Sequence, residues 1–224
     1  MARLDFISRL HTRTQRDYVQ RVVAHDKAAC AEKAKQWGYD YWDGERQYGY
    51  GGMHYDGRWL PVAEEMAAHY GLKAGDRILD IGCGKGFLLY EFTRAVPGIE
   101  VVGLDISTYG IENAKLEIRS SLRVGNCTDL PFMDDAFDFV YSINTFHNLM
   151  NFELDAALKE MQRVGNNHRY ICVESYRNEL EKVNLLYWQL TCESFFRPEE
   201  WAWFMTQAGY DGDEDYIFFE PAPI

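Results

Sequence analysis

Three glycines and two aspartates lie at spacings that suit the binding of a nucleoside. The segment "LDIGCGKGF" places Asp80 just ahead of Gly82, Gly84 and Gly86, directly after an apolar run. Glycine lets the backbone turn sharply and lets a ligand approach main-chain N–H groups at the start of a helix. Nineteen residues after Gly86, Asp105 ends a second apolar run in "LDIS", where its carboxylate is placed to bind both hydroxyls of a ribose. These residues predict a site for a cofactor that carries a nucleoside.

The elements that must position these residues alternate along the chain. Apolar segments typical of strands cover residues 77–82, 100–106, 121–126, 137–143, 169–175 and 213–220. Helical patterns cover residues 61–72, 85–96, 109–119, 153–164, 179–192 and 198–209. Strand and helix in alternation predict an α/β fold with a doubly wound, mostly parallel sheet that carries helices on both faces.

The first 59 residues have a different pattern. Residues 12–36 are rich in Ala, Lys, Arg and Gln without Pro or Gly, which predicts one long helix that Gly38 ends. Residues 48–59, "YGYGGMHYDGRW", combine three tyrosines, a tryptophan and a histidine with four glycines and have no helical or strand period. We therefore divide the chain into an N-terminal helix and aromatic-glycine lid, residues 1–59, and a cofactor-binding domain, residues 60–224.

Charge and composition exclude some functions. The chain has 224 residues and a net charge of −12, which disfavours a nucleic-acid partner. Residues 1–36 are the exception, with eight Lys and Arg against four acids; they steer an anionic substrate or partner, or form a solvated helix face. The apolar runs are shorter than the ~20 residues that span a bilayer. Five dispersed cysteines predict reduced thiols and a cytoplasmic location, and the histidines lack the spacing of a metal site.

The motifs together resemble the class I S-adenosylmethionine-dependent methyltransferases, most closely the small-molecule branch that includes ubiquinone-biosynthesis methyltransferases. The likeness covers roughly residues 60–210 and rests on "LDIGCGKGF", "LDIS" and "GNCTDLPF", in that order, each at a predicted strand end. It implies S-adenosylmethionine as cofactor. The positions that it matches to the cofactor are Asp80, Gly82, Gly84, Gly86, Asp105, Ile106, Asn126, Cys127 and Ser142.

The resemblance also implies a role for each position. Asp80 would orient the methionine amino group, and Asp105 would bind the ribose. Ile106 would pack on the adenine, while Asn126 and the backbone of Cys127 would read its edge. The family often has Asp where Asn126 stands, and the Asn carbonyl can serve the adenine amino group instead.

The segment ahead of the first strand commonly folds over the cofactor in this family. Tyr50 would add a ring face for the sulfonium, Arg58 would pair with the methionine carboxylate, and Ser142 would line the methionine end. The glycines of residues 48–59 would let this lid hinge; the alternative is a static loop that covers the core. The substrate-binding candidates are Tyr48, Tyr55, Trp59, His147 and Tyr176.

Methyl transfer to a hydroxyl also needs a proton acceptor, whereas a neutral amine needs none at the attack step. His147 and Glu174 follow or end the fourth and fifth predicted strands, and His54 is a third catalytic candidate. Each of the first two is as consistent with a packing role as with catalysis. The acceptor we expect is a small molecule, and the chain looks like stand-alone bacterial methyltransferases of surface-polysaccharide or natural-product genes, which suggests a sugar. A homodimer is left open.

Three alternatives to methyl transfer stay open. A nicotinamide-dependent dehydrogenase would have the spacing G-x-G-x-x-G, whereas this chain has G-x-G-x-G. A non-catalytic partner subunit with the same fold should have lost cofactor residues, and a site for aminopropyl transfer would look much the same. The family usually ends in an antiparallel strand pair, but only residues 213–220 are plainly strand-like here.

Overall fold

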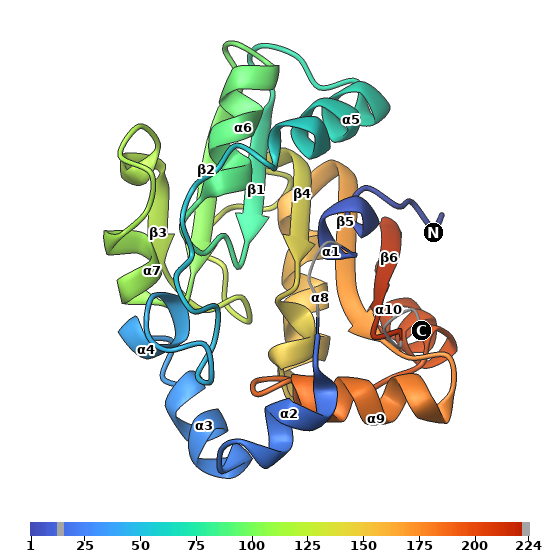
Figure 1. Cartoon of the computed structure of the whole chain (residues 1–224). Helices are drawn as coiled ribbons and strands as arrows, with labels where there is room; N and C mark the ends of the chain where they lie inside the picture. Colours follow the sequence, from blue (N-terminus) through green and yellow to red (C-terminus); the bar gives the residue numbers. More distant parts are fainter. Residues whose placement is uncertain (13–15, 221–224) are drawn as a thin grey trace.

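The computed structural model describes residues 1–12 and 16–220, and its centre is one six-stranded sheet (Figure 1). The strands are β1 (Arg77–Ile81), β2 (Glu100–Asp105), β3 (Leu122–Val124), β4 (Phe137–Ile143), β5 (Gly165–Ser175) and β6 (Asp213–Phe218). They lie in the order β3-β2-β1-β4-β5-β6, and every neighbouring pair is parallel. The strand order reverses between β1 and β4, and ligands of such sheets bind beyond the carboxyl ends of the strands at this point.

Helices cover both faces of the sheet, as the doubly wound fold predicts. They are α1 (Ser8–His11), α2 (Tyr18–Val23), α3 (Lys27–Ala34), α4 (Tyr39–Trp42), α5 (Leu60–Tyr70), α6 (Phe87–Ala95), α7 (Thr108–Glu112), α8 (Asn151–Val164), α9 (Glu179–Trp188), α10 (Pro198–Gln207) and the 3-10 turns η1 (Arg119–Ser121) and η2 (Phe146–Asn148). Ile78 and Phe139 of the sheet pack with α5 and α6 on one face. Leu79 and Val140 pack with α8 and α10 on the other face. This burial on both faces explains why the strands are almost continuously apolar.

The predicted helix over residues 12–36 is wrong. Two helices, α2 and α3, occupy this part of the described chain, and residues 13–15 lie outside the described residues. The Asp26 side chain accepts a hydrogen bond from the amide of Ala29 and so starts a new helix. An aspartate in this position is a strong helix N-cap, which the even composition of the segment conceals.

Two other helices end earlier than predicted, and the chain that follows each of them forms hydrogen bonds with distant parts of the fold. The prediction for residues 109–119 fails after Glu112, and the Lys115 amide donates to the Lys85 carbonyl in the glycine turn, 3.2 Å away. The prediction for residues 179–192 fails after Trp188, and the amides of Glu193 and Ser194 donate to the His147 carbonyl. In both cases, the segment that follows the helix runs to the carboxyl edge of the sheet. The predicted helix over residues 61–72 is confirmed, and Gly71 ends it with φ 64°.

The sheet ends differently from the family's usual antiparallel pair. β6 runs parallel to β5, and residues 186–196 form no strand. The N-terminus covers the outer edge of β6 instead: the Leu4 amide donates to the Glu214 carbonyl and the Glu214 amide donates to the Ala2 carbonyl, at 3.0 and 2.9 Å. This contact satisfies edge groups that would otherwise be unpaired. Within the described residues, the helices are all too short or too polar to cross a membrane.

Candidate active site

The glycine turn between β1 and α6 forms the floor of the site. Gly82 and Gly84 have φ of 86° and 54°, in the left-handed region that favours glycine. A Cβ at Gly82 would lie 2.0 Å from the Thr145 hydroxyl oxygen, and a Cβ at Gly84 would lie 2.7 Å from the Trp42 ring. The turn is therefore packed between the loop after β4 and the N-terminal segment, with no room for side chains.

A cavity of about 270 Å³ opens above this turn, and we call it the cofactor cavity. Eight predicted cofactor residues line it: Asp80, Gly82, Gly84, Asp105, Ile106, Asn126, Cys127 and Tyr50. Trp37, Tyr41, Trp42 and Trp59 of the N-terminal segment also line it. The structure thus brings the ends of β1, β2 and β3 together under an aromatic cover.

Asp105 sits at the end of β2 with its carboxylate held by two main-chain amides. One oxygen accepts from the Gly84 amide and the other from the Ser107 amide, both at 2.7 Å. Each carboxylate oxygen accepts about two hydrogen bonds, so one acceptor position on each oxygen stays available for a ligand. Asp105 therefore both fixes the glycine turn and faces the cavity.

Asp80 ends β1 in a buried position without an ion pair to any described residue. Burial raises the pKa of its carboxyl to about 8, the Tyr141 hydroxyl opposes this shift, and the charge of Asp105 adds to it. A cation that reached Asp80 would stabilise its ionised form and lower this pKa. The carboxyl is therefore suited to bind an ammonium group of a ligand.

The far end of the cofactor cavity has one apolar and one polar wall. Ile106 is 57% exposed, which is unusual for a large aliphatic side chain and leaves its face open to a planar ligand. The Asn126 carbonyl oxygen accepts from the Thr128 amide at 3.0 Å, so its amide group and second lone pair face outward. The Cys127 side chain is buried in the core, which leaves its backbone at the cavity wall.

A second cavity of about 370 Å³ adjoins the first, and we call it the acceptor cavity. The two cavities share Tyr41, Tyr50, Met53, Trp59, Phe87 and Asn144 as lining residues. His54, His147 and Glu174 line the acceptor cavity alone. Asn144, at the junction, has φ 58°, and its side-chain oxygen is buried without a hydrogen bond from the described residues. Strained backbone and an unpartnered polar atom are features of functional sites.

His147 and Glu174 form a buried pair in the wall of the acceptor cavity. The Glu174 amide donates to Nδ1 of His147 at 3.3 Å, so the proton of the neutral ring is on Nε2, which lies 3.5 Å from a Glu174 carboxyl oxygen. Burial lowers the pKa of His147 to about 3 and raises that of Glu174 to about 8. The side-chain amide of Gln189 donates to the other Glu174 oxygen. Of the two, Glu174 has the pKa of a base that works near neutral pH.

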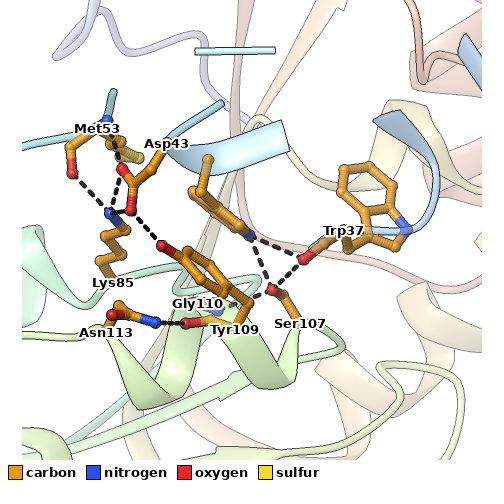
Figure 2. A network of polar contacts seen from close by, with 9 residues as sticks. Trp37, Asp43, Met53, Lys85, Ser107, Tyr109, Gly110 and Asn113 are labelled. Carbon is orange, nitrogen blue, oxygen red and sulfur yellow. Dashed lines mark hydrogen bonds and ion pairs between the residues drawn. The ribbon is translucent and has the colours of Figure 1, made fainter. Parts of the chain in front are cut away.

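Polar contacts clamp the N-terminal segment over the cofactor cavity (Figure 2). Lys85, whose side chain is 4% exposed, donates to both oxygens of Asp43 at 2.7 Å and to the Met53 carbonyl at 2.9 Å. The Tyr109 hydroxyl donates to Asp43 at 2.8 Å. A separate contact joins the Trp42 indole N–H to the Ser107 hydroxyl, also at 2.8 Å. Asp43, which directly follows α4, thus links α4 to the glycine turn and to α7.

Several predicted site residues lie elsewhere. Ser142 does not line the cofactor cavity, because its hydroxyl donates to the Ile81 carbonyl within the sheet. Arg58 pairs with Asp56 and lines the acceptor cavity instead of the cofactor cavity. Gly86, with φ 69°, begins α6 and packs against Ile118. These positions support the site without facing the cofactor cavity.

Three predicted substrate residues do not line either cavity. The Tyr55 hydroxyl donates to Glu91 at 2.7 Å and so ties residues 48–59 to α6. The Tyr48 ring packs under Lys33, 4.1 Å from its amino nitrogen, and Tyr176 is buried in the core. Trp59, by contrast, lines both cavities.

The sequence analysis missed residues that line the two cavities. Trp37, Trp42, Asn144, Gln189, Arg16, Arg21 and Arg46 are the main ones. A detectable signal existed for the tryptophans, since they precede the aromatic-glycine segment in "WGYDYWDG". The arginines lie on separate elements, and only the fold brings them together.

Comparisons with known proteins agree with this geometry. Residues 72–219 match a family model described as a methyltransferase domain. Demethylmenaquinone methyltransferase of Symbiobacterium thermophilum is 33% identical over 128 residues, which cover 53% of this chain and 50% of that protein. The 27-O-demethylrifamycin SV methyltransferase of Amycolatopsis mediterranei is 30% identical over 95 residues, which cover 39% of this chain and 35% of that protein. The chain spans half or less of the length of these relatives.

Solved structures show the same architecture. A chain in the complex of the Haloferax volcanii Trm112 methyltransferase activator with a methyltransferase is 24% identical, with a TM-score of 0.58 over 80% of this chain and 75% of that chain. The YcgJ protein of Bacillus subtilis is 22% identical, with a TM-score of 0.53 over 68% of each chain. At these identities the likeness concerns the fold alone.

Proposed function

The chain belongs to the class I methyltransferase family, and from this premise we propose that it transfers the methyl group of S-adenosylmethionine to an oxygen or nitrogen of a small molecule. The observation that carries the proposal is the junction of the two cavities. One cavity is lined by Asp105, the carboxylate that we propose binds the ribose, and the other is lined by Glu174, the base that we propose. Transfer needs a donor site and an acceptor site that meet, and these two share a wall.

The residues that line the cofactor cavity fit S-adenosylmethionine. Asp80, which has no cation among the described residues, would hold the amino group, and Asp105 would hold the ribose with its two remaining acceptor positions. The exposed face of Ile106 would pack on the adenine, with Asn126 and the backbone of Cys127 at its edge. Bound there, the cofactor supplies an electrophilic methyl group on a positively charged sulfur.

The residues of the acceptor cavity would prepare the nucleophile. Glu174, once ionised, would accept the proton of an attacking hydroxyl or hold an ammonium group. His147 would position Glu174 through the hydrogen bond that its Nδ1 accepts from the Glu174 amide, and its own low pKa makes it a poor base. Glu174 is thus our first candidate for the general base, and His147 is a positioning residue. His54, which belongs to the N-terminal segment, also lines this cavity.

The N-terminal segment would exclude water from the transfer. Tyr50 and Trp42 stack with ring centroids 5.5 Å apart, and both line the cofactor cavity. We propose that residues 1–59 act as a cap on the domain of residues 60–224. A sugar or sugar-linked metabolite is the acceptor class we favour.

The labelling experiment tests the activity directly. Purified protein is incubated with methyl-labelled S-adenosylmethionine and fractionated small-molecule extract, and the labelled product is identified. Calorimetry with S-adenosylmethionine is the companion measurement, in which Asp105→Ala should abolish binding. Loss of two charge-assisted hydrogen bonds at about 1.5–3 kcal/mol each accounts for this. Unchanged affinity in a folded Asp105→Ala protein would refute the assignment of the cofactor cavity.

A further inference from the structure

We propose that the acceptor cavity binds an anionic group, a carboxylate or a phosphate, through Arg21 and Arg46 with Arg16 beside them. The inference rests on the proposed function and names the chemical class of the methyl acceptor. The acceptor would be a small acid whose anion lies on the arginines and whose hydroxyl or amine lies at Glu174. Three observations support it.

The first observation is the convergence of three cations on one ring. The guanidinium carbons of Arg16, Arg21 and Arg46 lie 5.4, 5.2 and 5.2 Å from the centroid of the Trp188 indole. All four residues line the acceptor cavity. The three arginines lie in different parts of the chain. Helix α2 packs beside α9, which ends at Trp188, and this packing brings α2 close to the ring (Figure 1). The fold has therefore gathered like charges that repel one another.

The second observation concerns the partners of these cations. Arg21 donates to the carbonyls of Trp188 and Arg46, at 3.4 and 2.7 Å, and Arg46 donates to the Gly49 carbonyl. Neither arginine forms an ion pair within residues 1–12 and 16–220. Arg58, in the same cavity, is neutralised by Asp56. The backbone contacts fix the position of the guanidinium groups and leave their charge uncompensated.

The third observation is the charge of the remaining cavity wall. Burial holds Glu174 largely protonated at pH 7, since its pKa is about 8, and keeps His11 and His147 neutral, with pKa values of about 3. Burial and the neighbouring Arg46 lower the pKa of Arg21, which shows an environment unfavourable to the cation. The cavity is therefore positive in a chain whose net charge is −12. An anionic ligand would offset the repulsion between the arginines, and the positive potential of the cavity would attract such a ligand.

The chemistry of arginine specifies the class of ligand. Its planar fork of N–H donors matches the oxygens of a carboxylate or phosphate in pairs. Within the sugar class proposed above, a neutral sugar has no anionic group for the arginines, whereas a sugar acid or a sugar phosphate has one.

Calorimetry with two probes tests the proposal independently of turnover. Inorganic phosphate and acetate are each titrated at low salt into the protein saturated with S-adenosylhomocysteine. We expect at least one anion to bind, and the variant Arg21→Gln/Arg46→Gln to weaken that binding tenfold or more. Arg123→Gln is the matched control, because Arg123 lies on β3 outside both cavities. Arg46→Lys, which keeps the charge without the fork, should lie between the two.

Two outcomes overturn the proposal: neither anion binds the wild-type protein, or the double variant binds as tightly as Arg123→Gln. Thermal unfolding verifies that the variants are folded. Titration of S-adenosylmethionine separates this result from the proposed function, since the double variant should retain its cofactor affinity. In the labelling experiment, the acceptor should be retained by an anion-exchange resin at pH 7. An acceptor in the unretained fraction also contradicts the proposal.

Discussion

Asp80 and Glu174 are two buried carboxyls near the carboxyl ends of β1 and β5, which β4 separates, and each has a pKa near 8. Desolvation is the main cause in both cases. Arg16 opposes the shift at Glu174 only in part. Burial of an ionised carboxyl is costly, so carboxyls with raised pKa values concentrate in sites where a ligand or a proton transfer uses them. Asp80 faces the cofactor cavity and Glu174 the acceptor cavity. Their roles thus follow from which cavity each one faces.

Replacement of Glu174 by Gln should slow methyl transfer and leave cofactor affinity intact. A general base contributes about 10²–10⁴-fold to a rate, so we expect a fall of that order with a hydroxyl acceptor. Because the base must be ionised, the wild-type rate should rise as pH increases through about 8, and the variant should lose this step. Rates at saturating acceptor between pH 6.5 and 9 give the profile. His147→Ala should slow transfer less; an unchanged rate in Glu174→Gln would assign the residue to packing.

The same carboxyls should make the cofactor-free protein less stable in mild alkali. Their folded pKa of about 8 exceeds the unfolded values, so the stability they contribute at low pH is lost as pH rises toward 8. His11 and His147 have lowered pKa values and act below about pH 6.5, so the interval from 6.5 to 8 isolates the carboxyls. We expect the free energy of unfolding, measured by urea titration, to fall over this interval by up to about 1.4 kcal/mol per pH unit for each carboxyl. The double variant Asp80→Asn/Glu174→Gln should remove this dependence of stability on pH. A dependence that persists in the variant would show that other groups cause it.

The sequence predicts individual residues best where the backbone alone determines their position. Asp80, Asp105 and Ile106 follow apolar runs of parallel strands, and the ends of parallel strands meet at one edge. Arg58 was wrongly expected at the methionine carboxylate because its choice between Asp56 and a ligand depends on how the loop folds. No pattern in the sequence reports such a choice.

At the level of elements, polar side-chain contacts add to apolar packing in holding the N-terminal segment to the domain. Asp43 receives Lys85, Tyr109 and the Met53 amide, and these come from three separate parts of the chain. The glycines of residues 48–59 include Gly51, with φ 69°. The left-handed backbone conformation at Gly51 favours glycine, and a hinge motion of this segment stays a proposal.

Lys85→Met should loosen this segment. The change removes three hydrogen bonds from a buried cation, which costs about 1.5–3 kcal/mol for a typical charged contact. Amide hydrogen exchange of residues 43–59 should become faster, and S-adenosylmethionine should bind more weakly, while the exchange of β4 and β5 stays the same. Lys159→Met, on the exposed side of α8, is the control. Equal exchange in the two variants would show that the clamp does not hold the segment.

Element type is predictable along most of this chain, and element ends are less so. β4 matches its predicted residues 137–143, because a continuous apolar run has few other solutions. The breaks after Glu112 and Trp188 depend on hydrogen bonds to Lys85 and His147, which are distant in sequence. Such bonds are invisible to a local pattern.

On the scale of the whole molecule, the chain closes its sheet with its own N-terminus. The parallel β6 and the bridge between Arg3 and Glu214 replace the antiparallel pair that the family resemblance led us to expect. Leu10 and His11 of α1 and Arg21 of α2 line the acceptor cavity. The part of the chain that completes the fold therefore also lines the proposed acceptor cavity. The sequence does not predict this double role of the N-terminal stretch.

The most direct test of the account is a crystal structure with S-adenosylhomocysteine. We expect the adenine between Ile106 and Asn126, the ribose on Asp105, and the sulfur at the junction of the two cavities beside Tyr50 and Asn144. That arrangement would aim the methyl group of the cofactor at Glu174. Electron density for the compound outside the cofactor cavity, or with its sulfur turned away from the acceptor cavity, would contradict the account.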